Sequence, residues 1–579
     1  FHFKTISKMK HLLSILSLSL CGSMLSAAKV PNFIILYADD LGYADTSVQM
    51  MDSDPSTKHK FIHTPGLERL ADLGARFTAA YAPTPTCTGS RVSIQFGQSS
   101  AKIQYRNVFD VLSMVQRPDK YDDEITLAEM MGETGHNYIT AHFGKGCSAM
   151  GRFDDAGYDI TDENPGEAGG NGNGHGSYWD PIRKKTPFPP DNPKRMHSLR
   201  RDAANFLNEY AGERPFFMMV SHYAPHIPFM CTRDAFERTK KRWIEAGFDT
   251  KGMEEITEDP VVNPKGDANK RIAYAAMIEE MDMALVDVLD VLEKKGELEN
   301  TYIIFTSDNG GGFSGRREVN GEPRRFNGPL QEGKRSIFEG GIRVPTVIAG
   351  PKIKAGTEID VPIVQWDFMG TFHDLSESQA PLPPNTDGGS LRDVFENGNN
   401  GVVKRSAPGI LHHYTCHYHP PISSIIIGDY KLMRHLNSGE LRLFNIKTDY
   451  AEQHDLAKQM PERVATMDAA RQKYVEEVDG GSVEAARAAY AKLMDKFSAQ
   501  TKENYRKKVK ELKEKGVADF DAQKAALLKE ANKGLRKNAQ NKKETEFYAS
   551  MTSFREGKLQ AKREAEAYMD ANWVDWDGE

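Results

Sequence analysis

Apolar runs that end in polar residues recur in the first part of the chain. The run Phe33–Tyr37 is followed after one alanine by Asp39 and Asp40, and the run in "NTYIIFTSDNGGG" ends in Asp308 and Asn309. A third run, in "ERPFFMMVSHYAPHIPF", leads into a segment rich in histidine and proline. Continuous apolar runs of this length are typical of strands that are buried on both faces. The pattern therefore predicts three buried strands, each followed by polar residues.

A different spacing precedes the second of these runs. In "RIAYAAMIEEMDMALVDVLDVLEKKGE" the apolar residues recur at helical spacing, and Gly296 provides a stop signal. Strands that alternate with helices predict an α/β fold: a large mixed, mostly parallel sheet sandwiched by helices. In such sheets ligands bind beyond the carboxyl ends of the strands. The polar residues after the strands are therefore expected to share one site.

The pattern changes after about residue 400. "SSIIIGDYKLMRHLNSGELRLFNI" predicts short antiparallel strands joined by turns at Gly428-Asp429 and at residues 437–439. From about residue 480 the chain is rich in Ala, Lys and Glu, which predicts a helical C-terminal extension with solvated charges. Its expected apolar faces are Tyr490, Leu493, Met494 and Phe497, and then Tyr505, Val509 and Leu512. The expected domains are 29–400, 401–478 and 479–579.

Composition and charge narrow the class of protein. The 579 residues are 39% hydrophobic with a formal net charge of −7, so nothing favours a nucleic-acid-binding surface. An anionic substrate would require a locally positive site. The Gly/Asn/Pro-rich stretch from about 162 to 195 predicts a long loop that is either functional or disordered.

The first residues are typical of a targeting segment. From Met9, "MKHLLSILSLSLCGSMLSAAK" has a basic start, a Leu/Ser apolar run and small residues at its end. We interpret residues 1–28 as a secretory signal peptide, which predicts a periplasmic or secreted protein without a transmembrane segment. A lipoprotein anchor at Cys21 is the less favoured alternative, because the preceding Leu20 is bulky.

The polar residues after the strands have the chemistry of a metal site. Asp39, Asp40, Asp308 and Asn309 offer hard oxygen ligands of the kind that calcium or magnesium binds. An isolated Asp-Asp pair is often only a helix cap or a turn. Two such pairs after two apolar strands make a divalent cation the better interpretation.

Basic residues lie in turns marked by glycine or proline. They are Arg91, Lys145, His226 and Lys334. Each alone is a common kind of surface charge, but together with a metal they would hold a tetrahedral oxyanion and stabilise charge on a leaving oxygen. Cys87 lies near Arg91 in "APTPTCTGSRVSIQFGQ", at the expected start of a helix. The alternative for Cys87 is a buried structural thiol.

Six ordered motifs carry a family resemblance. They are "PNFIILYADDLGY", "CTGSR", "GK" at Lys145, "PHIP", "FTSDNGG" and "GKRSIFEGGIRVP". Over roughly residues 30–470 the chain resembles the formylglycine-dependent type I sulfatases of the alkaline phosphatase superfamily, including their small C-terminal antiparallel sheet. The resemblance implies an alkaline-phosphatase-like fold, hydrolysis of sulfate esters and a calcium ion, with magnesium as the alternative.

The resemblance also implies a role for each candidate residue. A maturation enzyme would oxidise Cys87 to formylglycine, whose hydrate attacks the sulfur of the ester. Arg91 would hold the hydrate, Lys145 and Lys334 would bind sulfate oxygens, and His226 would help to protonate the leaving alcohol. The metal ligands would be Asp39, Asp40, Asp308 and Asn309.

Two positions depart from the pattern of the family. Gly89 stands where the family prefers Pro or Ala, which bears on recognition by the maturation enzyme. Cys147 follows Gly144-Lys145-Gly146 where the family usually has the histidine of Gly-Lys-Trp-His. Loss of a general base costs ~10²–10⁴-fold in its step, so slowed or altered turnover is expected. His142 is no substitute, because period two directs it away from Lys145 in an extended segment.

The substrate is indicated less directly. "LHHYTCHYHPP" resembles a histidine-rich segment of polysaccharide-type sulfatases, which makes His417 and His413 candidate substrate-binding residues. An interdomain hydrogen-bonded patch is the alternative for this cluster. Four arginines in the glycine-rich loop after Asn309 are candidates for contacts with further anionic groups of a sulfated glycan, with solvated surface charges as the alternative: Arg316, Arg317, Arg324 and Arg325.

These observations predict an exported sulfatase that acts on a sulfated carbohydrate. A phosphodiesterase or phosphomonoesterase of the same superfamily is the enzymatic alternative, since both esters are tetrahedral. Arg91, four residues after Cys87, and Lys334, before "EGG", favour sulfate. A catalytically impaired sulfoglycan-binding protein is the alternative from another class, because fold and function can separate.

Overall fold

The computed structural model describes most of the chain. The described residues are 29–103, 124–146, 153–154, 156–162, 191–312, 318–319, 322–323, 327–414, 422–436, 438–478, 483–517 and 519–547. The expected signal peptide, Cys147, His417 and the four arginines after Asn309 lie outside them.

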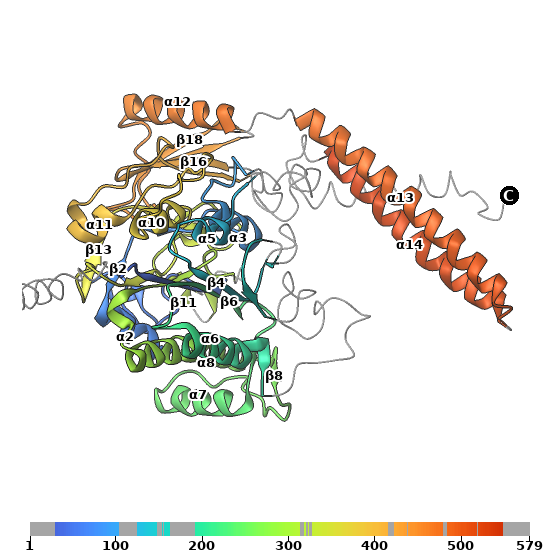
Figure 1. The fold of residues 1–579 in the computed structure, drawn as a ribbon, viewed down its shortest axis with the longest axis horizontal. Helices are drawn as coiled ribbons and strands as arrows, with labels where there is room; N and C mark the ends of the chain where they lie inside the picture. Colours follow the sequence, from blue (N-terminus) through green and yellow to red (C-terminus); the bar gives the residue numbers. More distant parts are fainter. Residues whose placement is uncertain are drawn as a thin grey trace, which may run out of the picture.

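An eight-stranded mixed sheet forms the centre of the molecule (Figure 1). Its order is β13 (Thr357–Ile359), β2 (Ala75–Phe77), β12 (Val347–Ala349), β9 (Thr301–Ser307), β1 (Asn32–Asp39), β6 (Phe216–Pro225), β4 (Ile139–Gly144) and β5 (Ile160–Thr161). The five strands from β9 to β5 pair in parallel, whereas β12 runs antiparallel to β9 and to β2. The predicted mixed, mostly parallel sheet is confirmed.

Helices cover both faces of this sheet (Figure 1). One layer contains α2 (Pro65–Leu73), α6 (Met196–Tyr210), α7 (Arg233–Glu245) and α8 (Asp267–Lys295). The other contains α3 (Cys87–Phe96), α5 (Leu127–Gly132), α10 (Asp367–Leu375) and α11 (Arg392–Asn397). Short elements connect these layers: β3 (Ala80–Tyr81), β7 (Met230–Cys231), β8 (Val261–Val262), β10 (Glu318–Val319), β11 (Glu322–Pro323), α9 (Glu339–Ile342) and β14 (Ile363–Val364).

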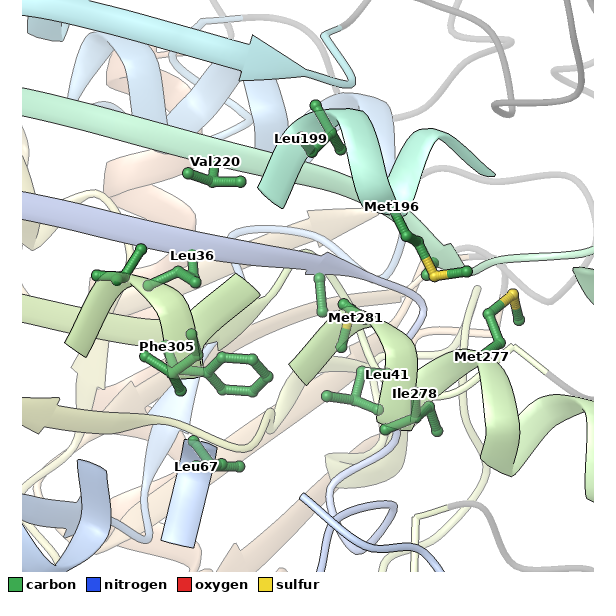
Figure 2. Packing of buried hydrophobic residues seen from close by; sticks show 14 of the residues in the cluster. Leu36, Leu41, Leu67, Met196, Leu199, Val220, Met277, Ile278, Met281 and Phe305 are labelled. Atoms are coloured by element: carbon green, nitrogen blue, oxygen red, sulfur yellow. The ribbon is translucent and has the colours of Figure 1, made fainter. Parts of the chain in front are cut away.

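The central strands have an apolar core on each face. Along β1, Ile34 and Leu36 belong to the core under α6 and α8, whereas Phe33 and Ile35 belong to the core under α10. Figure 2 shows the first of these cores, where Leu36 and Phe305 lie beneath the layer of α8. A strand that buries both of its faces needs apolar side chains at every position. This requirement explains the unbroken apolar runs of the sequence.

A second, four-stranded antiparallel sheet follows in the chain. It contains β15 (Ile410–Tyr414), β16 (Ile422–Ile427), β17 (Tyr430–His435) and β18 (Leu441–Asn445), and α12 (Pro461–Val478) packs against it. The predicted small antiparallel sheet is confirmed. Lys431 of β17, fully buried, pairs with Glu339 at 2.9 Å and with Glu452 at 2.8 Å. This cluster ties the second sheet to α9.

Two long helices complete the described structure. α13 (Val483–Glu514) and α14 (Phe520–Phe547) pack along one another as a hairpin (Figure 1). Tyr505 is buried in it, and Val509 and Leu512 are partly buried. The helical nature of this extension agrees with the sequence-based prediction, while the domain boundaries stay predictions. Among the described helices, none combines the length and the apolar character that a bilayer span requires.

Candidate active site

Four oxygen-bearing side chains meet where β1 and β9 end. The two strands pair in parallel with Ala38 opposite Ser307, so that Asp39 and Asp40 lie beside Asp308 and Asn309. All four side chains are almost completely buried. Asp40 turns the chain at φ 68°, in the left-handed region. The sheet therefore brings together residues that are about 270 positions apart in the sequence.

Hydrogen bonds hold this group in place. The Asp40 backbone N–H donates to Asp308 Oδ1 at 3.1 Å, and Asn309 Nδ2 donates to Asp40 Oδ1 at 2.8 Å. Two buried oxygens, Asp39 Oδ1 and Asn309 Oδ1, have no hydrogen-bond partner among the described residues. A buried acceptor without a partner costs free energy. These two oxygens are therefore available to a further ligand.

A divalent cation fits this set of residues. Asp39, Asp40 and His226 offer ligand atoms that lie within 4.8 Å of one another, as do Asp39, Cys87 and Asp308. Three neighbouring carboxylates, together with the two oxygens that accept no hydrogen bond from the described residues, form a ligand set of the type that hard cations prefer. The residues present would hold calcium or magnesium.

Three cations surround the acidic cluster. Lys145 Nζ lies 2.5 Å from Asp39 Oδ2, and Lys334 Nζ lies 2.6 Å from Asp40 Oδ1 and 2.8 Å from Asp40 Oδ2. Arg91 Nε donates to Asp308 Oδ2 at 2.8 Å. Each carboxylate is therefore matched by one basic residue. The site thus gathers three cations in spite of the negative net charge of the chain, and a bound divalent cation would give it the positive charge that an anionic substrate requires.

Arg91 is fixed by several further contacts. Its Nη1 donates to the backbone oxygen of Lys145 at 2.9 Å and also to Ser221 Oγ. Its guanidinium lies 5.0 Å from the centroid of the Tyr37 ring. Sequence reasoning missed Ser221, because a serine inside an apolar strand gives no signal of its own. A buried arginine with a defined orientation is suited to hold a group at Cys87.

Cys87 is the first residue of α3. Thr86 is the N-cap residue in an extended conformation, and the helix ends at Gly97, whose φ of 61° is left-handed. Cys87 is partly buried, while Gly89 and Arg91 are buried on the same helix. The helix dipole favours negative charge at an N-terminus. The thiol is therefore placed where the dipole and the nearby cations favour an anionic group.

Burial and charge shift the pKa values of the carboxyl groups in opposite directions. Burial alone would raise the pKa of Asp39, but Lys145, His226, Arg91 and Lys334 outweigh it and hold that pKa well below its usual range. Burial raises the pKa of Asp308 to about 7, against the opposing effect of Arg91. The Asp308 carboxyl group is thus hard to ionise without more positive charge nearby. A bound divalent cation would supply that charge.

His226 lies beside the acidic cluster. Its Nε2 is 3.6 Å from Asp40 Oδ2, and its Nδ1 is 2.6 Å from the backbone oxygen of Ile227. Burial lowers the pKa of His226 to about 4, and Lys334 adds to this effect. The structure thus brings all nine predicted catalytic and metal-binding residues to one end of the sheet.

Of the two histidines of the substrate prediction, the structure describes His413. His413 is buried in β15, opposite Ser423 of β16. Nε2 of its neighbour His412 lies 2.9 Å from the backbone oxygen of Ala82. This contact joins the four-stranded sheet to the segment that follows β3. A substrate-binding role of His413 stays a prediction. His142 is stacked on Phe153, with ring centroids 3.6 Å apart, and belongs to a core contact.

Buried neutral histidines predict a dependence of stability on pH. Burial lowers the pKa of His142 and of His222 to about 3, with Arg91 adding to both shifts. Between pH 6.5 and these values the unfolded chain binds protons that the folded chain does not. The stability is therefore complete above pH 6.5 and is lost as the pH falls, by about 1.4 kcal/mol per pH unit for each group.

This slope is measurable by denaturation between pH 7 and pH 4. Both ring nitrogens of His222 lack a hydrogen-bond partner among the described residues, so His222→Phe is expected to fold and to reduce the slope. His454→Phe is the matched control, because the His454 side chain is 81% exposed. An unchanged slope in His222→Phe would contradict the prediction.

Comparisons with known proteins identify the family of this chain. Residues 31–378 match the Sulfatase family model. Human steryl-sulfatase is 26% identical over 451 residues, which cover 67% of this chain and 73% of that protein. Choline-sulfatase from Rhizobium meliloti (strain 1021) is 25% identical over 466 residues, covering 74% and 82%. The ulvan-active sulfatase of Formosa agariphila is 25% identical over 393 residues, covering 63% and 65%.

Solved structures share the fold. Ps i-CgsB in complex with k-i-k-neocarrahexaose has a TM-score of 0.60 at 23% identity, covering 77% of this chain and 93% of that chain. BT4656 in complex with its substrate D-glucosamine-2-N,6-O-disulfate has a TM-score of 0.56 at 21% identity, covering 78% and 99%. Since the family model spans more than half of the chain, this protein belongs to the sulfatase family, the sulfuric ester hydrolases of the alkaline-phosphatase-like type.

Proposed function

We propose that this protein hydrolyses sulfate esters of a sulfated carbohydrate, with residue 87 as the nucleophile after its conversion to formylglycine. One observation carries the proposal: Arg91, Lys145 and Lys334 each pair with a different carboxylate of the cluster beside Cys87. With a divalent cation bound by the carboxylates, these three basic residues would give the site beside the thiol a net positive charge. It suits a monoanionic sulfate ester whose charge shifts to the leaving oxygen during reaction.

The metal site belongs to the same proposal. Asp39, Asp40, Asp308 and Asn309 would hold a calcium ion, with magnesium as the alternative. A bound divalent cation supplies Lewis-acid polarisation of an ester oxygen and offsets the charge of three buried carboxylates. Asp39 Oδ1 and Asn309 Oδ1, both without a hydrogen-bond partner among the described residues, support this assignment.

The other side chains would orient the nucleophile, bind the sulfate group and transfer a proton. Arg91, held by Asp308 and Ser221, would orient the hydroxyl groups of the matured residue 87. Lys145 and Lys334 would bind sulfate oxygens, which would take the place of the carboxylate oxygens that these lysines now contact. His226 would help to protonate the departing alcohol through Nε2, which must first take up a proton from water, because burial lowers the pKa of His226 to about 4.

Formylglycine formation requires a maturation enzyme that accepts the segment from Cys87 to Arg91. A formylglycine hydrate is a suitable nucleophile because its second hydroxyl group can expel sulfate and restore the aldehyde. Gly89 and Cys147 depart from the family pattern, and we expect slowed turnover from the second of them. A normal turnover rate in aldehyde-bearing protein would contradict this expectation.

A carbohydrate substrate is supported by the relatives. One relative is an ulvan-active sulfatase, and structures of the same fold are in complex with k-i-k-neocarrahexaose and with D-glucosamine-2-N,6-O-disulfate. His413 and His417 are the proposed substrate-binding histidines. The interpretation of residues 1–28 as a signal peptide fits a polymer substrate outside the cytoplasm.

The experiment compares three substrate classes with one preparation of full-length protein. Protein co-expressed with a formylglycine-generating enzyme and supplied with Ca²⁺ is incubated with sulfated oligosaccharides, an aryl sulfate and an aryl phosphate. We expect release of sulfate from at least one oligosaccharide, at a kcat/KM above that for the aryl phosphate. Preferred hydrolysis of the phosphate would favour the phosphoesterase. Binding of oligosaccharides without sulfate release from any substrate would favour the impaired binding protein.

A further inference from the structure

The hairpin of α13 and α14 has a charge opposite to that of the rest of the chain. Its two helices contain sixteen Lys and Arg against nine Asp and Glu, which gives a formal net charge of +7. The whole chain has a net charge of −7, so the residues outside the two helices carry −14. A charge asymmetry of this size within one chain indicates a segment that interacts with an anionic partner.

The hairpin extends away from both sheets (Figure 1). Its helices pack along one another, and Asn538 Nδ2 of α14 donates to Ser498 Oγ of α13 at 3.4 Å. Tyr505 of α13 and Ala531 and Leu535 of α14 are buried. The remaining sides of the two helices are therefore open to a partner.

A row of exposed basic residues follows one face of α14. Lys529, Lys533 and Arg536 are all exposed, and their spacing of four and then three residues places them on the same face of the helix. At a rise of 1.5 Å per residue the row is about 10 Å long. The buried Ala531 and Leu535 lie on the opposite face. This row of positive charge thus points away from the contact between the helices.

A second group of exposed basic residues lies on α13. Arg506, Lys507 and Lys510 are exposed, and their positions span about 100° of the helix circumference, an arc that does not include the buried Tyr505. Lys510 Nζ lies 3.8 Å from Glu514 Oε1, with 78% and 64% of these side chains exposed. Such a surface pair contributes little free energy, so it competes only weakly with binding of another anion.

The chemistry of the hairpin favours a sulfated polymer over other anionic partners. Among the described residues, the large apolar side chains that are exposed lie outside the hairpin. A helix that lies on a membrane needs an exposed apolar face, and single-stranded nucleic acids are bound by stacking on aromatic side chains. Rows of lysine and arginine without such side chains suit a polymer that is recognised by its charge, as heparin is.

We propose that the hairpin of α13 and α14 binds a sulfated polysaccharide outside the active site. The inference rests on the proposed function, because it assigns a second binding surface to the same class of substrate. Residues with a net charge of −14 repel a polysulfated chain, and a basic hairpin offsets this repulsion. The hairpin would thus keep the polymer at the enzyme while the active site removes sulfate groups.

The test measures binding of a sulfated polymer by full-length protein, separately from turnover. The probe is dextran sulfate, with unsulfated dextran as the reference, at about 0.15 M salt so that distant charges are screened. Glutamine is the replacement, because its helix propensity is similar to that of lysine and arginine. The α13 variant combines Arg506→Gln, Lys507→Gln and Lys510→Gln. The α14 variant combines Lys529→Gln, Lys533→Gln and Arg536→Gln.

A matched control removes the same number of charges elsewhere. It combines Lys241→Gln, Lys352→Gln and Lys473→Gln, three lysines whose side chains are 76%, 60% and 79% exposed and which lie outside the hairpin. A further variant joins the α13 and α14 substitutions. Circular dichroism compares the helix content of all variants with that of the unsubstituted protein.

We expect dextran sulfate to bind at least ~10-fold more weakly to the joined variant, since each basic residue near an anionic surface strengthens binding by about fivefold. The α13 and α14 variants should each lose part of this affinity, and the control should keep it. The kcat/KM for a sulfated polysaccharide should fall in the joined variant, while that for a small aryl sulfate should not change. A hairpin whose charges are merely solvated would give none of these differences.

Unchanged dextran sulfate affinity in the joined variant would overturn the inference and leave the proposed function as it stands. Tighter binding of duplex DNA than of dextran sulfate, lost in the same variant, would assign the hairpin to a nucleic acid instead. Hairpin-dependent binding of dextran sulfate by a protein that releases no sulfate from any ester would support the binding surface and contradict the proposed function. If the joined variant loses helix content, the α13 and α14 variants decide by the same criteria.

Discussion

Replacing Cys87 by alanine is expected to lower the hydrolysis of sulfate esters by at least ~10⁴-fold. The reason is that removal of a nucleophile leaves only binding and electrostatic stabilisation, and in well-studied hydrolases this costs up to ~10⁶-fold in kcat. Cys87 Sγ shares a site with carboxylate oxygens of Asp39 and Asp308, all within 4.8 Å. The measurement is sulfate release by Cys87→Ala and by the unsubstituted protein, both purified from cells that contain a formylglycine-generating enzyme.

Cys231→Ala is the matched control for this experiment. Cys231 is the other cysteine among the described residues, and it is fully buried in the core beneath α7 and α8. The control is expected to keep its turnover and to lose at most a little stability. Mass spectrometry of the tryptic peptide that carries residue 87 identifies the active species. Undiminished turnover in Cys87→Ala would contradict the proposed mechanism. If residue 87 were an unmodified thiol in all of the active protein, formylglycine could not be the nucleophile.

Removal of the metal is the second change with a large expected effect. A chelator is expected to abolish turnover and Ca²⁺ to restore it, because three buried carboxylates need a divalent cation to organise the anion site. Calcium at 100 times its Kd would stabilise the fold by about 2.7 kcal/mol. In Asp39→Asn this thermal response should be lost, and turnover should fall by more than ~10²-fold, since even outer-shell changes at metal sites reach that size.

Asp45→Asn is the control that separates loss of the metal site from the general effect of replacing a buried aspartate. Asp45 is also buried, but its Oδ2 accepts a hydrogen bond from the Tyr274 hydroxyl at 2.8 Å. Burial raises the pKa of Asp45 well above its usual range, so the asparagine replaces a neutral group by a neutral group. Its response to Ca²⁺ should match that of the unsubstituted protein. A full calcium response in Asp39→Asn would show that the cation binds elsewhere.

The residues of the site differ in how readily the sequence reveals them. Cys87 and the carboxylates stand in motifs that can be read directly, since each follows an apolar run or a proline-rich approach. Ser221 stands in no motif. Its importance arises from its contact with Arg91, which is distant in the sequence.

Much of the fold was predictable because it depends on local patterns. The unbroken apolar run of β1 required burial on both faces, and the helical spacing before Gly296 predicted α8, which ends there with a left-handed glycine. The turns at Gly428 and Gly439 likewise separate β16, β17 and β18, and both glycines have positive φ. The short strands β13, β2 and β12, which lie next to one another at one side of the sheet, have three residues each and gave no comparable signal. Their pairing depends on neighbours rather than on their own pattern.

The sequence by itself determined which residue types follow the strands, and hence the chemistry that the site can perform. Only the tertiary structure decided which cation pairs with which carboxylate, and that Asp39 and Asn309 each keep a buried oxygen free of protein hydrogen bonds among the described residues. The physical reason is that the burial of a strand can be predicted from the apolar character of adjacent residues. Charge pairing depends on distances between groups about 100 to 300 positions apart, which only the folded sheet brings within a few ångströms.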